Sequence, residues 1–144
     1  MKVIKEIKLK NQVGELEHVL QFVEKIGEEL ALDTELVMNL KLVMEEMVSN
    51  IIFYAYPEGA EGAIELSVGG DEKELTFLLS DEGLEYDPTL KEDPDLDVNP
   101  AERRLGGMGI FIVKNLMDSI SYQRHDGKNL LTMKKNIRNY DTNI

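Results

Sequence analysis

The chain has 144 residues, 42% of them hydrophobic and 31% charged, and it contains no cysteine. This composition suits one globular domain, and the missing cysteines exclude disulfides, thiolate catalysis and cysteine-based zinc sites. The net charge of −12 would repel nucleic acid and anionic lipid, so we expect neither as a partner. No apolar run approaches the roughly 18 residues that cross a bilayer, and no signal peptide is evident, so we expect a cytoplasmic protein.

The first part of the chain predicts one strand and two helices. Residues 2–10 alternate in polarity, which is typical of a strand, and Asn11 could cap the helix that follows. Apolar residues at helical spacing across 16–30 predict an amphipathic helix of about 17 residues. A second helix is predicted over about 33–56, because Pro57 disfavours helix in the residue before it.

The later part of the chain predicts two hairpins with a helix between them. Residues 63–69 and 74–80 resemble strands joined by a glycine turn. Residues 109–117 are apolar and helix-like. The segments 119–125 and 130–137 then predict two closing strands around an Asp-Gly turn.

The segment from about 82 to 106 differs from the rest, because it holds three of the four prolines and many acidic residues. Such a long irregular stretch indicates a lid or binding loop, although a disordered acidic loop is the alternative. The tail, 138–144, is polar and expected to fray. The element order β-α-α-β-β-lid-α-β-β predicts one α+β domain over 1–144, a two-layer sandwich whose mostly antiparallel mixed sheet has helices on one face.

Glu46 and Asn50 lie four residues apart on the second predicted helix, and therefore on one face. A carboxylate there could orient or deprotonate a hydroxyl, and an asparagine oxygen suits Mg²⁺. A solvated helix face would explain the same pattern. The spacing also leaves Glu45 open as the important acid.

Asp81 follows a strand-like run, and Gly83 relaxes the backbone just after it. A buried carboxylate here could accept a hydrogen bond from the exocyclic amine of adenine. A turn aspartate bonded to its own backbone is the alternative.

A glycine cluster opens the apolar helix near residue 109, where free N–H groups and the helix dipole attract phosphate. A flexible hinge is the alternative. Either of the two arginines just upstream could reach a terminal phosphate, or could be a solvated pair. The residues concerned are Arg103, Arg104, Gly106, Gly107, Met108 and Gly109.

The three motifs above, taken in their order along the chain, resemble those of the GHKL ATPases. Within that superfamily, they are most similar to those of the small anti-sigma-factor serine/threonine kinases. The chain has no P-loop and no His-Arg-Asp or Asp-Phe-Gly kinase motif. The resemblance runs from the first strand to about Lys135. It is carried by Glu46-Met-Val-Ser-Asn50, Asp81-Glu-Gly83, Gly106-Gly-Met-Gly109 and Asn129-Leu-Leu-Thr132.

The resemblance implies a Bergerat ATP-binding fold that uses ATP and Mg²⁺. Glu46, rather than Glu45, would be the catalytic base, and Asn50 would be the magnesium ligand. It further implies that Asp81 binds adenine, that Gly83 admits it, that Thr132 supports it through water, and that the phosphates lie against Gly106, Gly107, Met108 and Gly109, with Arg104 nearby.

The resemblance also implies a serine/threonine kinase that acts as an anti-sigma factor by partner switching. Its substrate would be an anti-anti-sigma protein of the STAS type, its other partner a sigma factor, and relatives pair as homodimers. Two alternatives are a non-catalytic ATP-binding module that holds a protein partner and a regulatory ATPase whose target is not a sigma factor. Tyr54 departs from the pattern, since relatives often have histidine there.

Overall fold

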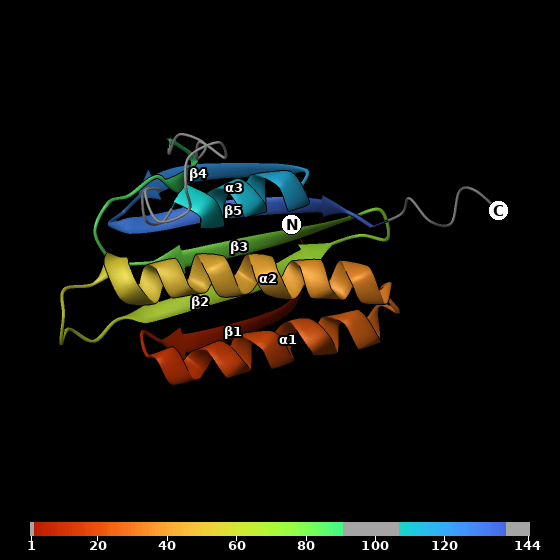
Figure 1. The fold of residues 1–144 in the computed structure, drawn as a ribbon, viewed down its shortest axis with the longest axis horizontal. Coiled ribbons are helices and arrows are strands. Elements are labelled where there is room, and N and C mark those ends of the chain that lie inside the picture. Colours follow the sequence, from red (N-terminus) through yellow and green to blue (C-terminus); the bar gives the residue numbers. More distant parts are fainter. Residues whose placement is uncertain (1, 91–106, 138–144) are drawn as a thin grey trace, which may run out of the picture.

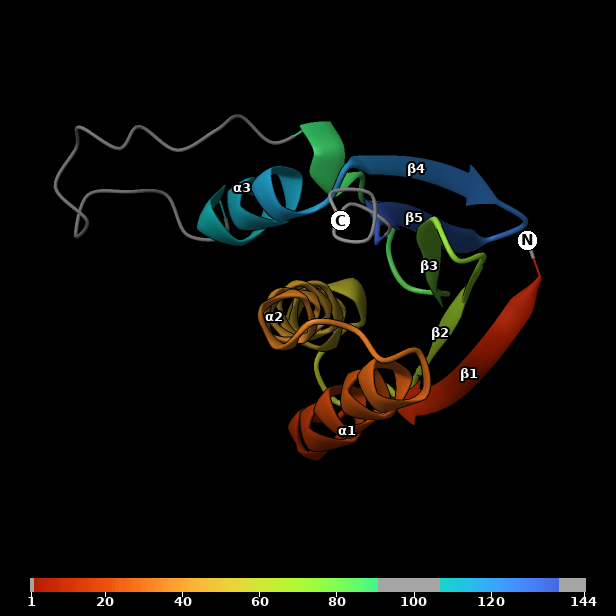
Figure 2. The same ribbon diagram turned by 90° about the vertical axis from the view of Figure 1, so that its right-hand side faces the viewer.

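The computed structural model describes residues 2–90 and 107–137, which form a five-stranded sheet with helices on one face. The strand order is β1-β2-β3-β5-β4, and each neighbouring pair is antiparallel. Figures 1 and 2 show the two layers, with α1, α2 and α3 side by side across the sheet. The predicted two-layer α+β fold is confirmed, and no parallel pair occurs among the described strands, so the sheet is not mixed there.

The strands and helices lie close to their predicted positions. The strands are β1 (Val3–Lys10), β2 (Ala63–Gly70), β3 (Glu74–Asp81), β4 (Ser119–His125) and β5 (Lys128–Asn136). The helices are α1 (Leu16–Glu29), α2 (Thr34–Asn50) and α3 (Gly107–Leu116), with short 3₁₀ turns at Val13–Glu15 and Pro88–Leu90 and a π-helical turn at Ile51–Ala55. No helix within the described ranges is long and apolar enough to cross a membrane.

The prediction that Asn11 caps the first helix is wrong. A 3₁₀ turn precedes α1, and the Asn11 side chain instead bonds the loop before β2. Its Nδ2 donates to the Ala60 carbonyl at 2.8 Å, and its Oδ1 accepts from the Gly62 N–H at 3.0 Å. A side chain occupied by a distant backbone cannot also satisfy the first N–H groups of a helix.

The predicted second helix continues beyond Asn50, but as a π-helical turn, Ile51–Ala55. Tyr56 ends it, with its ring half-buried. The Tyr56 hydroxyl donates to the Ala63 carbonyl at 2.7 Å and accepts from the Glu82 N–H at 2.9 Å, so it ties α2 to both β2 and the loop after β3. Burial raises the pKa of the Tyr56 phenol.

The core lies between the helices and one face of the sheet. Alternation along the strands places every second side chain on that face, and each buried large apolar side chain there contributes about 1.5–3 kcal/mol. At Gly27 the two long helices approach closely, because a Cβ would lie 2.5 Å from a methyl group of Val37. The fully buried members include Val19, Ile26, Val43, Met44, Ile64, Leu66, Val68, Leu75, Phe77, Ile110, Val113 and Met133.

Candidate functional site

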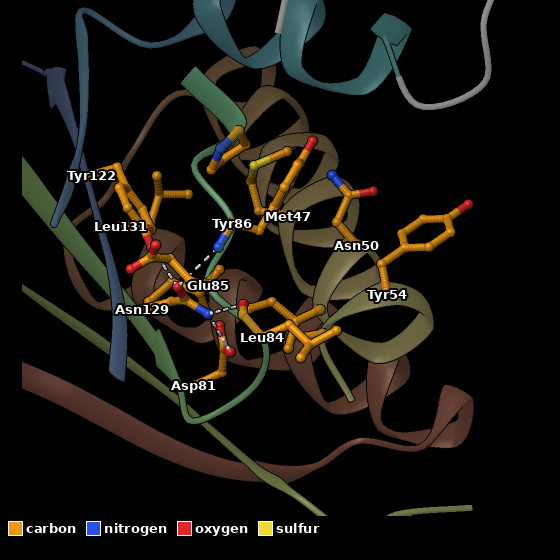
Figure 3. A pocket seen from close by; sticks show the side chains of 14 residues that line it. Met47, Asn50, Tyr54, Asp81, Leu84, Glu85, Tyr86, Tyr122, Asn129 and Leu131 are labelled. Atoms are coloured by element: carbon orange, nitrogen blue, oxygen red, sulfur yellow. Dashed lines mark hydrogen bonds between the residues drawn. The ribbon is translucent and has the colours of Figure 1, made fainter. Parts of the chain in front are cut away.

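A pocket of about 460 Å³ opens between the end of α2, the loop after β3 and the neighbouring ends of β4 and β5 (Figure 3). A mainly apolar pocket with a few converging polar groups is typical of a small-molecule site. It is lined by Met47, Asn50, Ile51, Tyr54, Ala55, Leu79, Asp81, Leu84, Glu85, Tyr86, Pro88, Tyr122, Asn129 and Leu131.

Asp81 is the last residue of β3, and its side chain is buried in the wall of this pocket. Its Oδ1 accepts from the Gly83 N–H at 2.8 Å and from Nδ2 of Asn129 at 2.9 Å. Asp81 therefore bonds its own turn, as the alternative interpretation expected, and it also lines the pocket, so its role toward adenine stays a prediction. Both of these bonds are made to the same oxygen, Oδ1.

Gly83 lies where the loop after β3 crosses the π-helical turn. A Cβ on Gly83 would be 2.4 Å from the Ala55 carbonyl oxygen and 2.6 Å from the Ala55 Cβ. The next residue, Leu84, donates its N–H to that same oxygen at 2.7 Å. Only glycine fits this close approach, so the residue holds the loop against the end of α2.

Glu46 lies on α2 against the start of α3. A Cβ on Gly109 would be 2.6 Å from Oε2 of Glu46, so the carboxylate and the glycine segment are adjacent, although 63 positions separate them. Glu46 is half-buried, whereas Glu45 is exposed. The structure thus brings Glu46 rather than Glu45 to the predicted phosphate segment, and Asn50 lines the pocket from the next turn of the helix (Figure 3).

The predicted phosphate segment is described only in part. Gly107 begins α3, as the glycine cluster predicts. Met108 follows within the helix. Arg103, Arg104, Gly106 and the lid positions 91–106 lie outside the described residues, so the roles predicted for them stay predictions.

The prediction that Thr132 supports adenine is wrong in its placement. Thr132 pairs with Leu78 in the sheet, whereas Asp81 pairs with Asn129. Residues three apart on a strand point to opposite faces, so Thr132 lies on the face away from Asp81 and the helices. Thr132 accordingly does not line the pocket.

Asn129 is the pocket residue that sequence reasoning missed. It is 7% exposed, and it lies opposite Asp81 in the β3–β5 ladder. The sequence did indicate this position. Leu131 and Met133 mark the buried face of β5, and Asn129 lies on the same face because it is two residues before Leu131. A polar residue on a buried face needs partners, and here it finds them in the pocket wall.

The described residues hold no cluster of three or more His, Cys, Asp or Glu side chains placed for a metal ion. Mg²⁺ in nucleotide sites usually has few protein ligands and shares the phosphates. A single amide oxygen from Asn50, on the pocket wall, fits that pattern.

Comparison with known proteins agrees with this geometry. Residues 9–135 match a family described as Histidine kinase-like ATPase domain. The serine/threonine-protein kinase BtrW of Bordetella bronchiseptica is 34% identical over 94 residues, which cover 65% of this chain and 66% of that protein. The serine-protein kinase RsbW of Bacillus subtilis is 27% identical, with 73% and 74% covered. The anti-sigma F factor of Bacillus subtilis is 32% identical, with 57% and 56% covered.

Two solved structures share the fold. The RsbU and RsbW domains of Rv1364c from Mycobacterium tuberculosis superpose with a TM-score of 0.60 at 11% identity, over 91% of this chain and 32% of that one. The blue-light activated histidine kinase EL346 of Erythrobacter litoralis gives a TM-score of 0.59 at 14% identity, over 90% and 42%. The chain thus spans a minor part of both larger proteins.

The chain therefore belongs to the histidine kinase-like ATPases, the GHKL superfamily. Within the superfamily, its relatives place it in the branch of the anti-sigma serine kinases. Membership of this family implies that the chain uses ATP.

Proposed function

We propose that this chain is an ATP- and Mg²⁺-dependent serine/threonine protein kinase that acts as a cytoplasmic anti-sigma factor by partner switching. Its substrate is a STAS-type anti-anti-sigma protein, and its alternative partner is a sigma factor. The relatives' names support this role. The observation that carries the catalytic part is the contact of the Glu46 carboxylate with Gly109, at the start of α3 and beside the pocket of Asp81.

The pocket end of the site would bind the base. Oδ2 of Asp81 accepts a hydrogen bond from the exocyclic amine of adenine, while Met47 and Leu131 cover the faces of the ring. Gly83 keeps the loop close to Ala55, so that the base can lie beside the backbone. A buried acceptor that matches a donor on the ligand gives both affinity and orientation.

The end of the site at Glu46 and the start of α3 would transfer the phosphoryl group. Bound ATP would supply the γ-phosphate, and Mg²⁺ would neutralise part of its charge. Glu46 accepts the proton of the substrate serine hydroxyl as the serine oxygen forms its bond to the γ-phosphorus. The bond from phosphorus to the bridging oxygen breaks, and ADP leaves with that electron pair. Asn50 would hold the metal, and the N–H groups at the start of α3 would bind the phosphates. Positioning and electrostatics provide most of the acceleration in such transfers.

The test is transfer of labelled γ-phosphate from ATP to STAS-domain proteins of the same genome, with wild type, Glu46→Ala and Glu45→Ala. A general base contributes about 10²–10⁴-fold, so Glu46→Ala should lose transfer by that factor while still binding ATP. Glu45→Ala is the matched control, because Glu45 is the exposed neighbour of Glu46 on α2 and has the same charge, so this variant should transfer normally.

Two other outcomes would overturn the kinase proposal. If wild type binds ATP and a protein partner but transfers nothing, the chain is a nucleotide-dependent binding module. If it hydrolyses ATP without phosphorylating any STAS protein, it is a regulatory ATPase with another target. Homodimer formation, which sedimentation of the same samples would detect, stays a prediction.

A further inference from the structure

Lys135 is a charged residue in the row of β5 side chains that faces the helices. Leu131 and Met133, in the same row, are buried in the core, and Lys135 is half-buried. Its Nζ donates to the Leu116 carbonyl at 2.7 Å. Leu116 is the last residue of α3, and the carbonyl groups in the last turn of a helix have no partner within that helix. Lys135 therefore caps the C-terminal end of α3 from the sheet.

The turn between α3 and β4 is tied to the end of β5 by two further hydrogen bonds. The Asp118 N–H donates to the Lys134 carbonyl at 2.9 Å. Oδ2 of Asp118 accepts from the Asn136 N–H at 2.6 Å. Directional bonds thus fix the C-terminal end of α3 to the sheet, where the helix covers β4 and β5 (Figures 1 and 2).

The N-terminal part of α3 meets the Glu46 carboxylate instead, at Gly109. Between the two ends, Ile110 and Val113 are buried in the core, but apolar packing is non-directional and orients a helix less strictly than hydrogen bonds do. A rotation of about 6° at the capped end would move Gly109 by about 1 Å, since Gly109 and Leu116 are about 10 Å apart along the helix at a rise of about 1.5 Å per residue. The cap at Leu116 therefore helps to set the contact at Gly109.

We propose that Lys135 is a positioning residue for phosphoryl transfer: by capping α3, it keeps Gly109 against the carboxylate of Glu46. The proposal rests on the proposed function, in which Glu46 accepts the proton of the substrate hydroxyl. Lys135 does not line the pocket, so it acts through the helix and not on the nucleotide. A misplacement of about 1 Å, caused by a substitution far from the reacting atoms, can slow a reaction about 10²-fold.

The first experiment is single-turnover transfer from saturating ATP to the STAS substrate. Lys135→Met keeps an unbranched side chain but removes the donor, so transfer should slow at least tenfold while the dissociation constant of ATP stays within about twofold. Lys135→Arg can still cap the helix and should return the rate to within about threefold of the wild type. Lys134→Met is the matched control, because Lys134 is the exposed neighbour of the same charge on the other face of β5. It should match the wild type.

The second experiment does not depend on catalysis. In isotope-labelled protein without nucleotide, the backbone amide resonance of Gly109 should move in Lys135→Met and stay in place in Lys134→Met, because only the first variant loses the cap. A double variant, Lys135→Met with Gly109→Ala, then tests whether the two changes act on the same contact. Its transfer rate should be close to that of the slower single variant, because changes that share a contact are not additive.

The outcomes separate the two proposals. If the wild type binds ATP but transfers no phosphate, the proposed function fails, and the role of Lys135 in transfer falls with it. If the wild type transfers phosphate, but Lys135→Met keeps the full rate or leaves the Gly109 resonance in place, the positioning role is overturned while the function stands. If the two single losses of rate multiply in the double variant, Lys135 acts elsewhere and its role is again overturned.

Urea unfolding of each variant without nucleotide identifies any that fails to fold. If Lys135→Met does so, Lys135→Gln takes its place. The glutamine amide is polar but is shorter than the lysine side chain, so this variant also loses the cap. The same slow transfer and the same displaced Gly109 resonance are expected, and a normal rate would overturn the proposal.

Discussion

The two ends of this site are built in different ways. The proposed base end consists of buried side chains on adjacent strands, where Asp81 and Asn129 are joined directly and each has further partners. The proposed catalytic end consists of one half-buried carboxylate, Glu46, whose Oε2 lies 2.6 Å from where a Cβ on Gly109 in α3 would be. A bonded network in a sheet has one geometry, whereas a long side chain against a glycine can shift. We therefore expect the base end to tolerate substitution poorly in binding, and the catalytic end to respond mainly in rate.

Among these substitutions, Asp81→Asn should have the largest effect on nucleotide binding, because it removes the acceptor proposed for the adenine amine. An amide in place of Oδ2 sets an N–H donor against the adenine amine. ATP at 100 times its dissociation constant should stabilise the wild type by about 2.7 kcal/mol, and the variant should lose this increment. Thermal unfolding with and without Mg²⁺ and ATP measures it. Asp126→Asn, in the exposed β4–β5 turn, should keep the increment, and a full increment in Asp81→Asn would place the base elsewhere.

Gly83→Ala tests the junction between the two ends. Its Cβ would lie 2.4 Å from the Ala55 carbonyl oxygen, so backbone must move. Overpacking of this kind costs about 1–3 kcal/mol in the free energy of unfolding, which urea titration measures. Gly14→Ala is the control, because nothing lies within 4 Å of its added Cβ. Equal stability of the two variants would show that the loop can lift from α2 without cost.

Gly109→Ala tests whether the proposed catalytic end affects the transfer rate without affecting stability. The added methyl group displaces the Glu46 carboxylate, which is the end of a flexible side chain, so the urea midpoint should hardly change. Transfer to the STAS substrate should fall at least tenfold, which corresponds to about 1.4 kcal/mol in the activation free energy. Single-turnover transfer at saturating ATP measures the rate. A normal rate would mean that the carboxylate works equally well from a displaced position.

Tyr56→Phe should give the smallest effect, about 1 kcal/mol at neutral pH, through loss of the bonds to Ala63 and Glu82. Burial raises the phenol pKa in the folded state. The phenol therefore contributes fully to the free energy of unfolding below its pKa in the unfolded chain, which is about 10. This contribution is lost as the pH rises through the higher pKa of the folded state. The stability difference between wild type and Tyr56→Phe should therefore shrink above about pH 10. Tyr54→Phe, at an exposed ring, should leave stability unchanged; a pH-independent difference for Tyr56 would contradict the argument.

The sequence predicted what depends on local pattern. Period-two and helical spacing placed the strands and helices, and the motif around Asp81 and Gly83 pointed to a residue that lines the pocket, Asp81. Asn129 and Thr132 show how a motif match can mislead, because a match three residues out of place selects a side chain on the other face of a strand, although the alternation of β5 indicates the buried face. Asn11 was missed as a loop-bonding residue since its partners, Ala60 and Gly62, lie far along the chain.

The pairing of β3 with β5 has a consequence for synthesis of the chain. Asp81 and Asn129 are 48 residues apart, and β5 is the last of the described strands to leave the ribosome. Contacts between distant segments form late, so a nascent chain that ends before β5 holds Asp81 without its partner. Such a chain could not hold the base in place. If the pocket binds the nucleotide as proposed, binding requires β5, and unfinished chains would not compete for ATP.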